Sequence, residues 1–188
     1  MFKKYDKSMA ILFVLASVGL LIAFIVNRDF FDWAFARHHN QFSWFIRPIF
    51  IIPFCFFAFK RSLSGISFTL FCIFTSMFWF PEPSSVNPNV QEFLQYEMDY
   101  LTGVWGMVKI LVTLIVPLSL TLLALAFWQR NIWFGFSIMT LIAFGKIGWS
   151  FIFAGDSGKS IILPATMGLA VCIFFVYLGI SRIKKTTQ

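Results

Sequence analysis

The sequence predicts an all-α integral membrane protein, folded as a compact bundle of about six transmembrane helices with an extracytoplasmic amphipathic helix between the third and fourth spans. The first indication is composition: 59% of the 188 residues are hydrophobic and only 12% are charged, whereas about a quarter of the residues of a soluble domain are charged. The second is that the apolar residues form long runs separated by short polar segments. The third is that basic and acidic residues gather in different segments. Together these features place the chain in a bilayer.

Apolar runs long enough to cross a bilayer define the predicted spans, because a hydrocarbon core of about 30 Å requires about 20 residues of helix. They cover residues 8–26, 42–59, 63–80, 104–128, 132–154 and 161–183, and a polar acidic segment, 81–103, separates the third run from the fourth. Helices are required because isolated strands would leave backbone groups unpaired in lipid, and the alternating pattern of a membrane barrel is absent. Residues 1–188 are therefore expected to form a single polytopic membrane domain.

The first run, residues 8–26, is interpreted as a retained span rather than a cleaved signal peptide, because no small-x-small cleavage site follows it. After this run, Phe31, Phe35 and His38 fall on one helical face, and Trp33 is a residue typical of a membrane interface. This pattern predicts a short helix that lies on the outer membrane surface.

Prolines and glycines indicate where the other spans depart from regular helices. Pro48 and Pro53 each remove a backbone donor from the second span, which is therefore expected to be kinked. Pro117 is expected to interrupt the fourth span for the same reason. In the fifth span, Gly145 and Gly148 lie three residues apart and predict a small-residue face for close helix contact.

The basic residues of the short connections predict the orientation, because Lys and Arg concentrate on the cytoplasmic side. With the N-terminus inside, nine basic residues fall in inner segments: Lys3, Lys4, Lys7, Lys60, Arg61, Arg130, Arg182, Lys184 and Lys185. Three fall in outer segments: Arg28, Arg37 and Lys159. Every acidic residue except Asp6 then lies outside. We therefore expect both termini in the cytoplasm and the chain in a plasma membrane such as the bacterial inner membrane.

The acidic segment, residues 81–103, is expected to contain an amphipathic helix. Asn87 followed by Pro88 is a helix start signal, with Asn as the cap and Pro at the first helical position. One face then carries the apolar residues Val90, Phe93, Leu94 and Leu101, with Glu97 in their midst. Helical phase therefore directs Glu97 toward the bundle, and directs the other acids of this helix toward water.

Three cations lie within the predicted spans: Arg47, Lys109 and Lys146. A charge near the bilayer centre costs at least about 2.5 kcal/mol, so such residues face a bundle interior, pair with an acid or extend to the interface. Counted from the outer ends of their spans, all three lie roughly 7–12 Å below the outer surface. Glu97 is therefore the predicted charge partner of one of the three.

Two interpretations of these cations remain open. In the first, each has a fixed carboxylate partner or extends to the interface, and the charges hold the outer ends of the helices together. In the second, Arg47, Lys109 and Lys146 form an outward-facing cationic pocket that binds a small anionic solute or a lipid headgroup. Whether the three side chains converge on one cavity distinguishes the two interpretations.

Five further polar residues are weaker candidates for such a site: His38, His39, Asp32, Glu92 and Asp99. Neighbouring residues on a helix diverge by about 100°, so the two histidines are poorly placed to share a metal ion. No metal and no cofactor are therefore expected. The interpretation that fits His38 and His39 better is that one packs beneath the aromatic surface and the other contacts lipid headgroups, with a role that depends on pH.

The segment FAGDSGKS, residues 153–160, contains parts of two catalytic motifs. A phosphate-binding loop requires a glycine at the position that Phe153 occupies. A serine nucleophile requires a histidine base, and the histidines occur as an adjacent pair in another segment. An ordinary turn therefore explains these residues.

Three function classes follow, in order of expectation. The first is a multi-pass membrane protein that binds or transports a small anionic solute or lipid headgroup. The second is an accessory or assembly subunit of a membrane complex. The third is a membrane-embedded lipid-modifying enzyme, which lacks a recognisable catalytic constellation. The expected partners are membrane lipids, an anionic ligand and either another membrane protein or further copies of the chain. Nucleic acid is not expected, because topology explains the basic residues.

Overall fold

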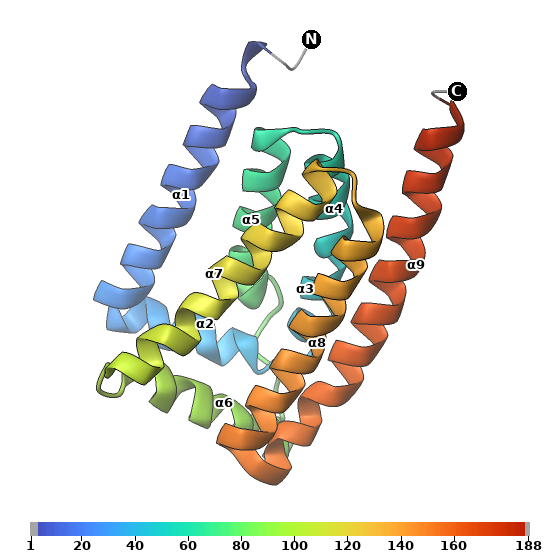
Figure 1. Ribbon diagram of the computed structural model, residues 1–188. Coiled ribbons are helices and arrows are strands. Elements are labelled where there is room, and N and C mark those ends of the chain that lie inside the picture. Colours follow the sequence, from blue (N-terminus) through green and yellow to red (C-terminus); the bar gives the residue numbers. More distant parts are fainter. Residues whose placement is uncertain (1–3, 187–188) are drawn as a thin grey trace.

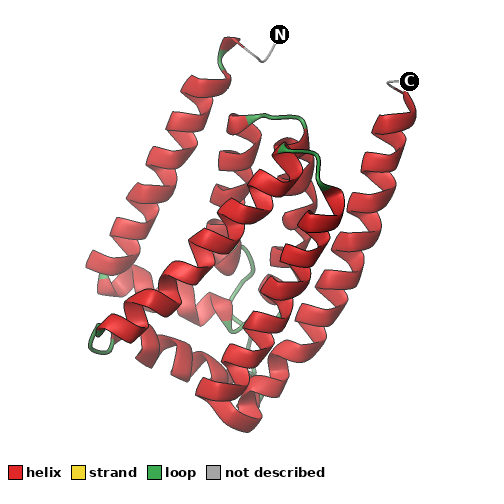
Figure 2. Ribbon diagram, viewed as in Figure 1, coloured by secondary structure: helices red, strands yellow, loops and turns green. Residues whose placement is uncertain are grey.

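The computed structural model describes the backbone of residues 4–186 and the side chains of residues 4–183. All regular structure in this range is helical (Figures 1 and 2). The elements are α1 (Asp6–Val26), α2 (Arg28–His38), α3 (Phe42–Ile49), α4 (Ile51–Phe59), α5 (Leu63–Thr75), η2 (Ser76–Phe78), α6 (Pro88–Thr102), α7 (Met107–Trp128), α8 (Ile132–Ala154), η3 (Gly155–Ile161) and α9 (Ile162–Thr186). The predicted all-α fold class is therefore confirmed.

The long helices form a bundle with two different ends (Figure 1). At one end α2 and α6 lie across the bundle, close to η3, and we call this the α6 end. At the other end lie the α4–α5 and α7–α8 turns, the start of α1 and the end of α9, and we call this the hairpin end. Lys3 and the side chains of Lys184 and Lys185, counted above among the inner cations, lie outside the described residues.

Four stretches of the described chain are long and apolar enough to cross a membrane. They are Asp6–Val26, Phe42–Phe59, Met107–Trp128 and Ile132–Ile183, and Leu63–Phe78 is apolar but shorter. The last of the four, Ile132–Ile183, contains α8 and α9, which run antiparallel beside each other and are joined by η3 (Figure 1). These stretches are those of a helical membrane protein.

Prolines affect the helices in two different ways. Between α3 and α4 the helix is interrupted at Phe50, because Pro53 has no N–H to donate to the carbonyl of Ile49. Pro117, in contrast, lies inside α7, which is continuous from Met107 to Trp128. The prediction that Pro117 interrupts its helix was therefore wrong, as membrane-type helices tolerate an internal proline when packing compensates for the lost bond.

Close helix packing occurs at α9 rather than at the predicted glycines of α8. A Cβ added to Gly168 of α9 would lie 2.5 Å from the Cβ of Pro48 in α3. Within the part of the chain that the structure describes, nothing lies within 4 Å of a Cβ added to Gly145 or Gly148. The prediction of a close contact at those two glycines was therefore wrong.

Helix α6 begins where the sequence predicts. The side chain of Asn87 accepts a hydrogen bond from the N–H of Asn89, and Pro88 is the first helical residue. Val90, Phe93 and Leu94 are buried against the α6 end of the bundle. Their apolar cluster also includes aromatic residues of α2 and α3, namely Phe31, Phe35 and Trp44. This packing positions the next turn of α6, which carries Glu97, over α8.

Candidate functional site

Glu97 and Lys146 form an ion pair between α6 and α8. Lys146 Nζ lies 2.6 Å from Glu97 Oε1. The same ammonium group lies 4.8 Å from the ring centroid of Trp149 and 5.3 Å from that of Phe93. An aromatic ring face attracts a cation, so the charge of Lys146 is compensated by one carboxylate and two rings.

Arg47 lies in α3 and makes no such short contact with a carboxylate. Its side chain is half-buried, but its Nε atom is fully buried and has no hydrogen-bond partner within the described chain. Glu97 is the carboxylate that attracts its charge, although it forms its short contact with Lys146. Buried donors in folded proteins are nearly always paired. The guanidinium of Arg47 therefore has hydrogen-bonding capacity that the described part of the chain does not use.

His38, at the end of α2, is buried beside these charges. Its Nδ1 lies 2.8 Å from Ser43 Oγ, and that hydroxyl donates its proton to the carbonyl of Asn40. Nδ1 therefore carries a proton and donates to Ser43. Burial lowers the pKa of His38 well below its ordinary value, and the charges of Arg47 and Lys146 lower it further. The imidazole is thus neutral near pH 7.

We call His38, Arg47, Glu97 and Lys146 the Arg47 cluster. Aromatic contacts fix the elements that carry these four residues. The indole of Trp44 donates to the carbonyl of His38 at 3.1 Å and packs against the ring of Phe93 at 5.5 Å between centroids. Helices α2, α3, α6 and α8 therefore meet at the α6 end, where they surround two cations, one carboxylate and one neutral imidazole.

Lys109 is placed elsewhere. Its Nζ donates to the carbonyl of Gly103 at 3.0 Å and lies 4.5 Å and 4.9 Å from the ring centroids of Trp105 and Tyr100. All these contacts are with the last turn of α6 or with the segment that joins α6 to α7, and none is with the Arg47 cluster. Of the three predicted ligand-binding cations, the structure brings two together and holds the third at the start of α7.

The weaker candidates have local partners or face outward. His39 Nδ1 contacts the carbonyl of Phe35 at 2.8 Å, and Asp32 pairs with Arg28 at 3.0 Å. Asp99 accepts a hydrogen bond from Gln95 at 2.9 Å, and Glu92 is exposed. Among the residues whose side chains the structure describes, no group of three His, Cys, Asp or Glu could hold a metal ion.

A cleft of about 450 Å³ opens beside the Arg47 cluster, between residues 39–45 and 83–90. His39, Asn40 and Asn87 give it a partly polar wall, and the side chain of Asn40 donates to the carbonyl of Pro81 at 3.0 Å. Val90 lines this cleft and belongs to the same apolar cluster as Trp44. The sequence did not predict this cleft, because the cleft depends on how the loop before α6 and the first turn of α6 pack against the α2–α3 turn.

The chain matches no protein-family model, no curated protein and no solved structure.

Proposed function

We propose that this chain is a multi-pass membrane protein that binds an anionic group, a small solute or a lipid headgroup, at Arg47. The observation that carries the proposal is the buried Nε of Arg47, which has no hydrogen-bond partner in the described chain. A buried cation is costly unless it is paired and hydrogen-bonded. An anion that approaches from the α6 end would supply the missing acceptor and would add to the negative charge of Glu97, which Arg47 shares with Lys146.

The proposed topology places this site toward the extracytoplasmic side. Helices α8 and α9 each contain enough residues to cross separately, and Leu63–Phe78, at about 1.5 Å per residue, extends for about 24 Å. Counting these segments individually gives six spans. The basic turns of the hairpin end then face the cytoplasm together with both termini. Arg47 is the sixth residue of α3, so it lies about 7–8 Å from the start of that helix.

A second candidate function, an accessory or assembly subunit, is favoured by the other two cations. Lys146 is compensated by Glu97, and Lys109 is held by a carbonyl and two rings. Closed contacts of this kind are those of residues that fix helix packing. The two candidates differ in what they require of Arg47: a binding site needs it for an external anion, whereas an assembly subunit does not.

Binding of radiolabelled inorganic phosphate to the purified protein in detergent tests the proposal. Arg47→Gln should weaken binding at least about tenfold, because it removes a charge-assisted hydrogen bond of about 1.5–3 kcal/mol. Lys109→Gln, which makes the same change in a cation outside the cluster, should retain binding. Competition by short-chain phosphatidic acid at concentrations where free phosphate fails would identify a lipid headgroup as the ligand. Equal binding by the two variants, or none by the unaltered protein to either probe, would contradict the proposal.

A further inference from the structure

The two turns at the hairpin end are built alike. In the α4–α5 turn, Arg61 donates its N–H to the carbonyl of Ala58, and Ser62 donates to that of Phe57. In the α7–α8 turn the equivalent donors are the N–H groups of Arg130 and Asn131, which bond to the carbonyls of Phe127 and Ala126. All four bonds are 2.9 Å long and form the same helix-terminating motif twice. Each turn therefore ends one helix and at once begins the next, with Ser62 or Asn131 as the new cap.

Both turns carry an arginine where the backbone favours glycine. Arg61 has a φ of 58° and Arg130 a φ of 62°, which is the left-handed region. This position most often holds glycine, because a Cβ is strained there. The turns themselves therefore do not account for arginine at these positions. In the proposed topology these turns face the cytoplasm, which favours basic residues there, and an exposed guanidinium group can also bind an anion.

Each arginine contacts the hairpin that carries the other arginine. Arg61 Nε donates to the carbonyl of Trp128, the last residue of α7, at 3.3 Å. The guanidinium of Arg130 lies 5.3 Å from the ring centroid of Phe59, the last residue of α4. Both side chains remain exposed. The contacts bring two guanidinium groups to the same junction between α4–α5 and α7–α8.

Neither arginine forms an ion pair with a residue that the structure describes. The one acid at this end, Asp6, is occupied by the first turn of α5: it accepts hydrogen bonds from the N–H groups of Leu63 and Ser64, at 2.9 Å and 3.1 Å. Lys60, also exposed, adds a third positive charge next to Arg61.

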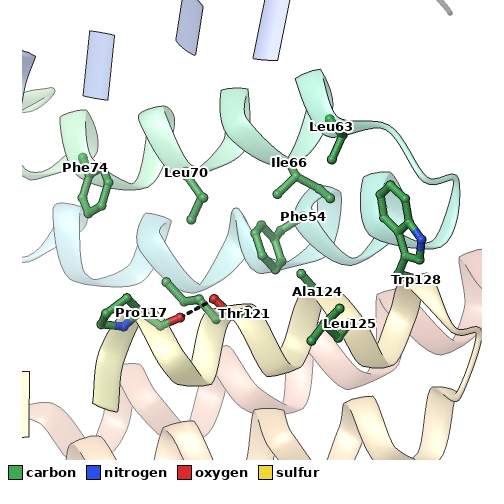
Figure 3. Close-up of a pocket in the computed structure, with 11 residues that line it drawn as sticks. Phe54, Leu63, Ile66, Leu70, Phe74, Pro117, Thr121, Ala124, Leu125 and Trp128 are labelled. Carbon is green, nitrogen blue, oxygen red and sulfur yellow. Dashed lines mark hydrogen bonds between the residues drawn. The ribbon is translucent and has the colours of Figure 1, made fainter. Parts of the chain in front are cut away.

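An apolar groove begins at the same junction. It has a volume of about 470 Å³ and lies between α5 and α7, with Phe54 of α4 beside it (Figure 3). Leu63 and Trp128 stand at the arginine end of the groove, and Phe74 and Pro117 stand at the other end (Figure 3). From Leu63 to Phe74, helix α5 extends for about 16 Å. Thr121 is a polar residue among those that line the groove, and its hydroxyl donates a hydrogen bond to the carbonyl of Pro117 at 2.8 Å.

We propose that this groove and the two arginines bind one anionic glycerophospholipid. One acyl chain lies along the groove, and the headgroup phosphate lies between Arg61 and Arg130. The occupant is a membrane lipid because two features meet here. The apolar groove runs along helices apolar enough to cross a membrane, and Arg61 and Arg130, which form no ion pair within the described chain, lie at one end of it. Basic pockets at the cytoplasmic ends of transmembrane helices bind anionic headgroups in this way. This site lies at the opposite end of the bundle from Arg47 and does not depend on the function proposed above.

Native mass spectrometry of the purified protein, with phosphatidylglycerol or phosphatidylcholine added at equal concentration, tests the proposal. The unaltered protein should retain phosphatidylglycerol preferentially. The double variant Arg61→Gly, Arg130→Gly should lose that preference at least about tenfold and should unfold at the same or a higher temperature in lipid-free detergent, because glycine relieves the strain of both turns. The control Arg28→Gln, Lys159→Gln removes two charges at the α6 end and should keep the preference.

Thr121→Phe tests the groove separately, because it should weaken binding of both lipids by filling the groove, whereas Ser119→Phe on the same helix should not. Equal retention of the two lipids by the unaltered protein would overturn the proposal. So would equal preference in the glycine variant and its control, or a lower unfolding temperature of the glycine variant in lipid-free detergent. A second copy of the chain retained in place of lipid would show that the groove is a protein interface instead.

Discussion

At the scale of single residues, Arg47 and Lys146 carry the same charge in different surroundings. Lys146 contacts Glu97 at 2.6 Å and two aromatic rings, so removing Glu97 would leave its charge only partly compensated. Arg47 Nε has no partner to lose within the described chain. Mutations should therefore separate a cation that holds helices together from one that is available to a ligand.

The first prediction concerns two double-mutant cycles, in which Glu97→Gln is combined with Lys146→Met or with Lys109→Met. Coupling with Lys146→Met should be about 1 kcal/mol, because 43% of the Lys146 side chain is exposed and exposed ion pairs are weak. Coupling with Lys109→Met should be close to zero, because Lys109 contacts residues 100–105 instead. Thermal unfolding in detergent measures both cycles. Additivity in the Lys146 cycle would show that the ion pair does not contribute to stability.

The second prediction concerns pH. Burial and the neighbouring cations lower the pKa of His38 in the folded protein, so below about pH 6.5 the unfolded chain binds a proton that the folded protein does not. Stability should therefore fall as the pH falls below that value, by up to about 1.4 kcal/mol per pH unit. Unfolding temperatures between pH 7 and pH 5 measure the effect. His38→Gln should flatten this dependence, His39→Gln should leave it, and an equal slope in all three proteins would be inconsistent with a buried neutral His38.

At the scale of helices, local chain chemistry predicted some features and not others. The start of α6 follows from Asn87 and Pro88, and the break at Phe50 follows from Pro53, because each depends on hydrogen bonds within a few residues. The helical phase of α6 also predicted that Glu97 faces the bundle. It could not select Lys146 among three cations, because that depends on which helix lies beneath α6. For the same reason the sequence did not indicate that α9 packs closely against α3 at Gly168.

The third prediction concerns the close packing of α9 against α3. Gly168→Ala should destabilise the protein by about 1–3 kcal/mol, because its new Cβ would lie 2.5 Å from the rigid ring of Pro48. Gly145→Ala makes the same change in α8 where the structure leaves open space, and should be neutral or stabilising by up to about 1 kcal/mol. The unfolding temperatures of the two variants measure the difference. Equal effects would mean that α9 does not pack closely against α3.

At the scale of the whole molecule, charge is divided between the two ends of the bundle. The α6 end contains the Glu97–Lys146 pair and Arg47, whose Nε has no hydrogen-bond partner in the described chain, while Arg61 and Arg130 lie at the hairpin end. Run lengths and basic residues were sufficient to predict a helical membrane protein. They could not predict that Lys109 lies apart from Arg47, since the direction in which α7 crosses the bundle is set by packing.

The fourth prediction concerns topology. If the segments α1, α3–α4, α5–η2, α7, α8 and α9 each cross once, a reporter fused after Gln188 should be active on the cytoplasmic side. A reporter inserted in the loop before Asn87 should be active on the opposite side. A pair of reporters, one active only in the cytoplasm and one active only outside it, should give opposite signals at each position. A C-terminal reporter active outside would require an odd number of spans and would overturn the proposed orientation of the Arg47 cluster.

The stability of Arg47→Met, with and without an anion, tests the central claim most directly. Without an anion, the variant should unfold at a higher temperature than the unaltered protein, because methionine removes a buried donor that has no hydrogen-bond partner in the described chain. With saturating short-chain phosphatidic acid the order should reverse, because the ligand stabilises only the protein that binds it. A variant that is less stable without the anion, and whose difference from the unaltered protein does not change when the anion is added, would contradict the claim and show that Arg47 serves helix packing.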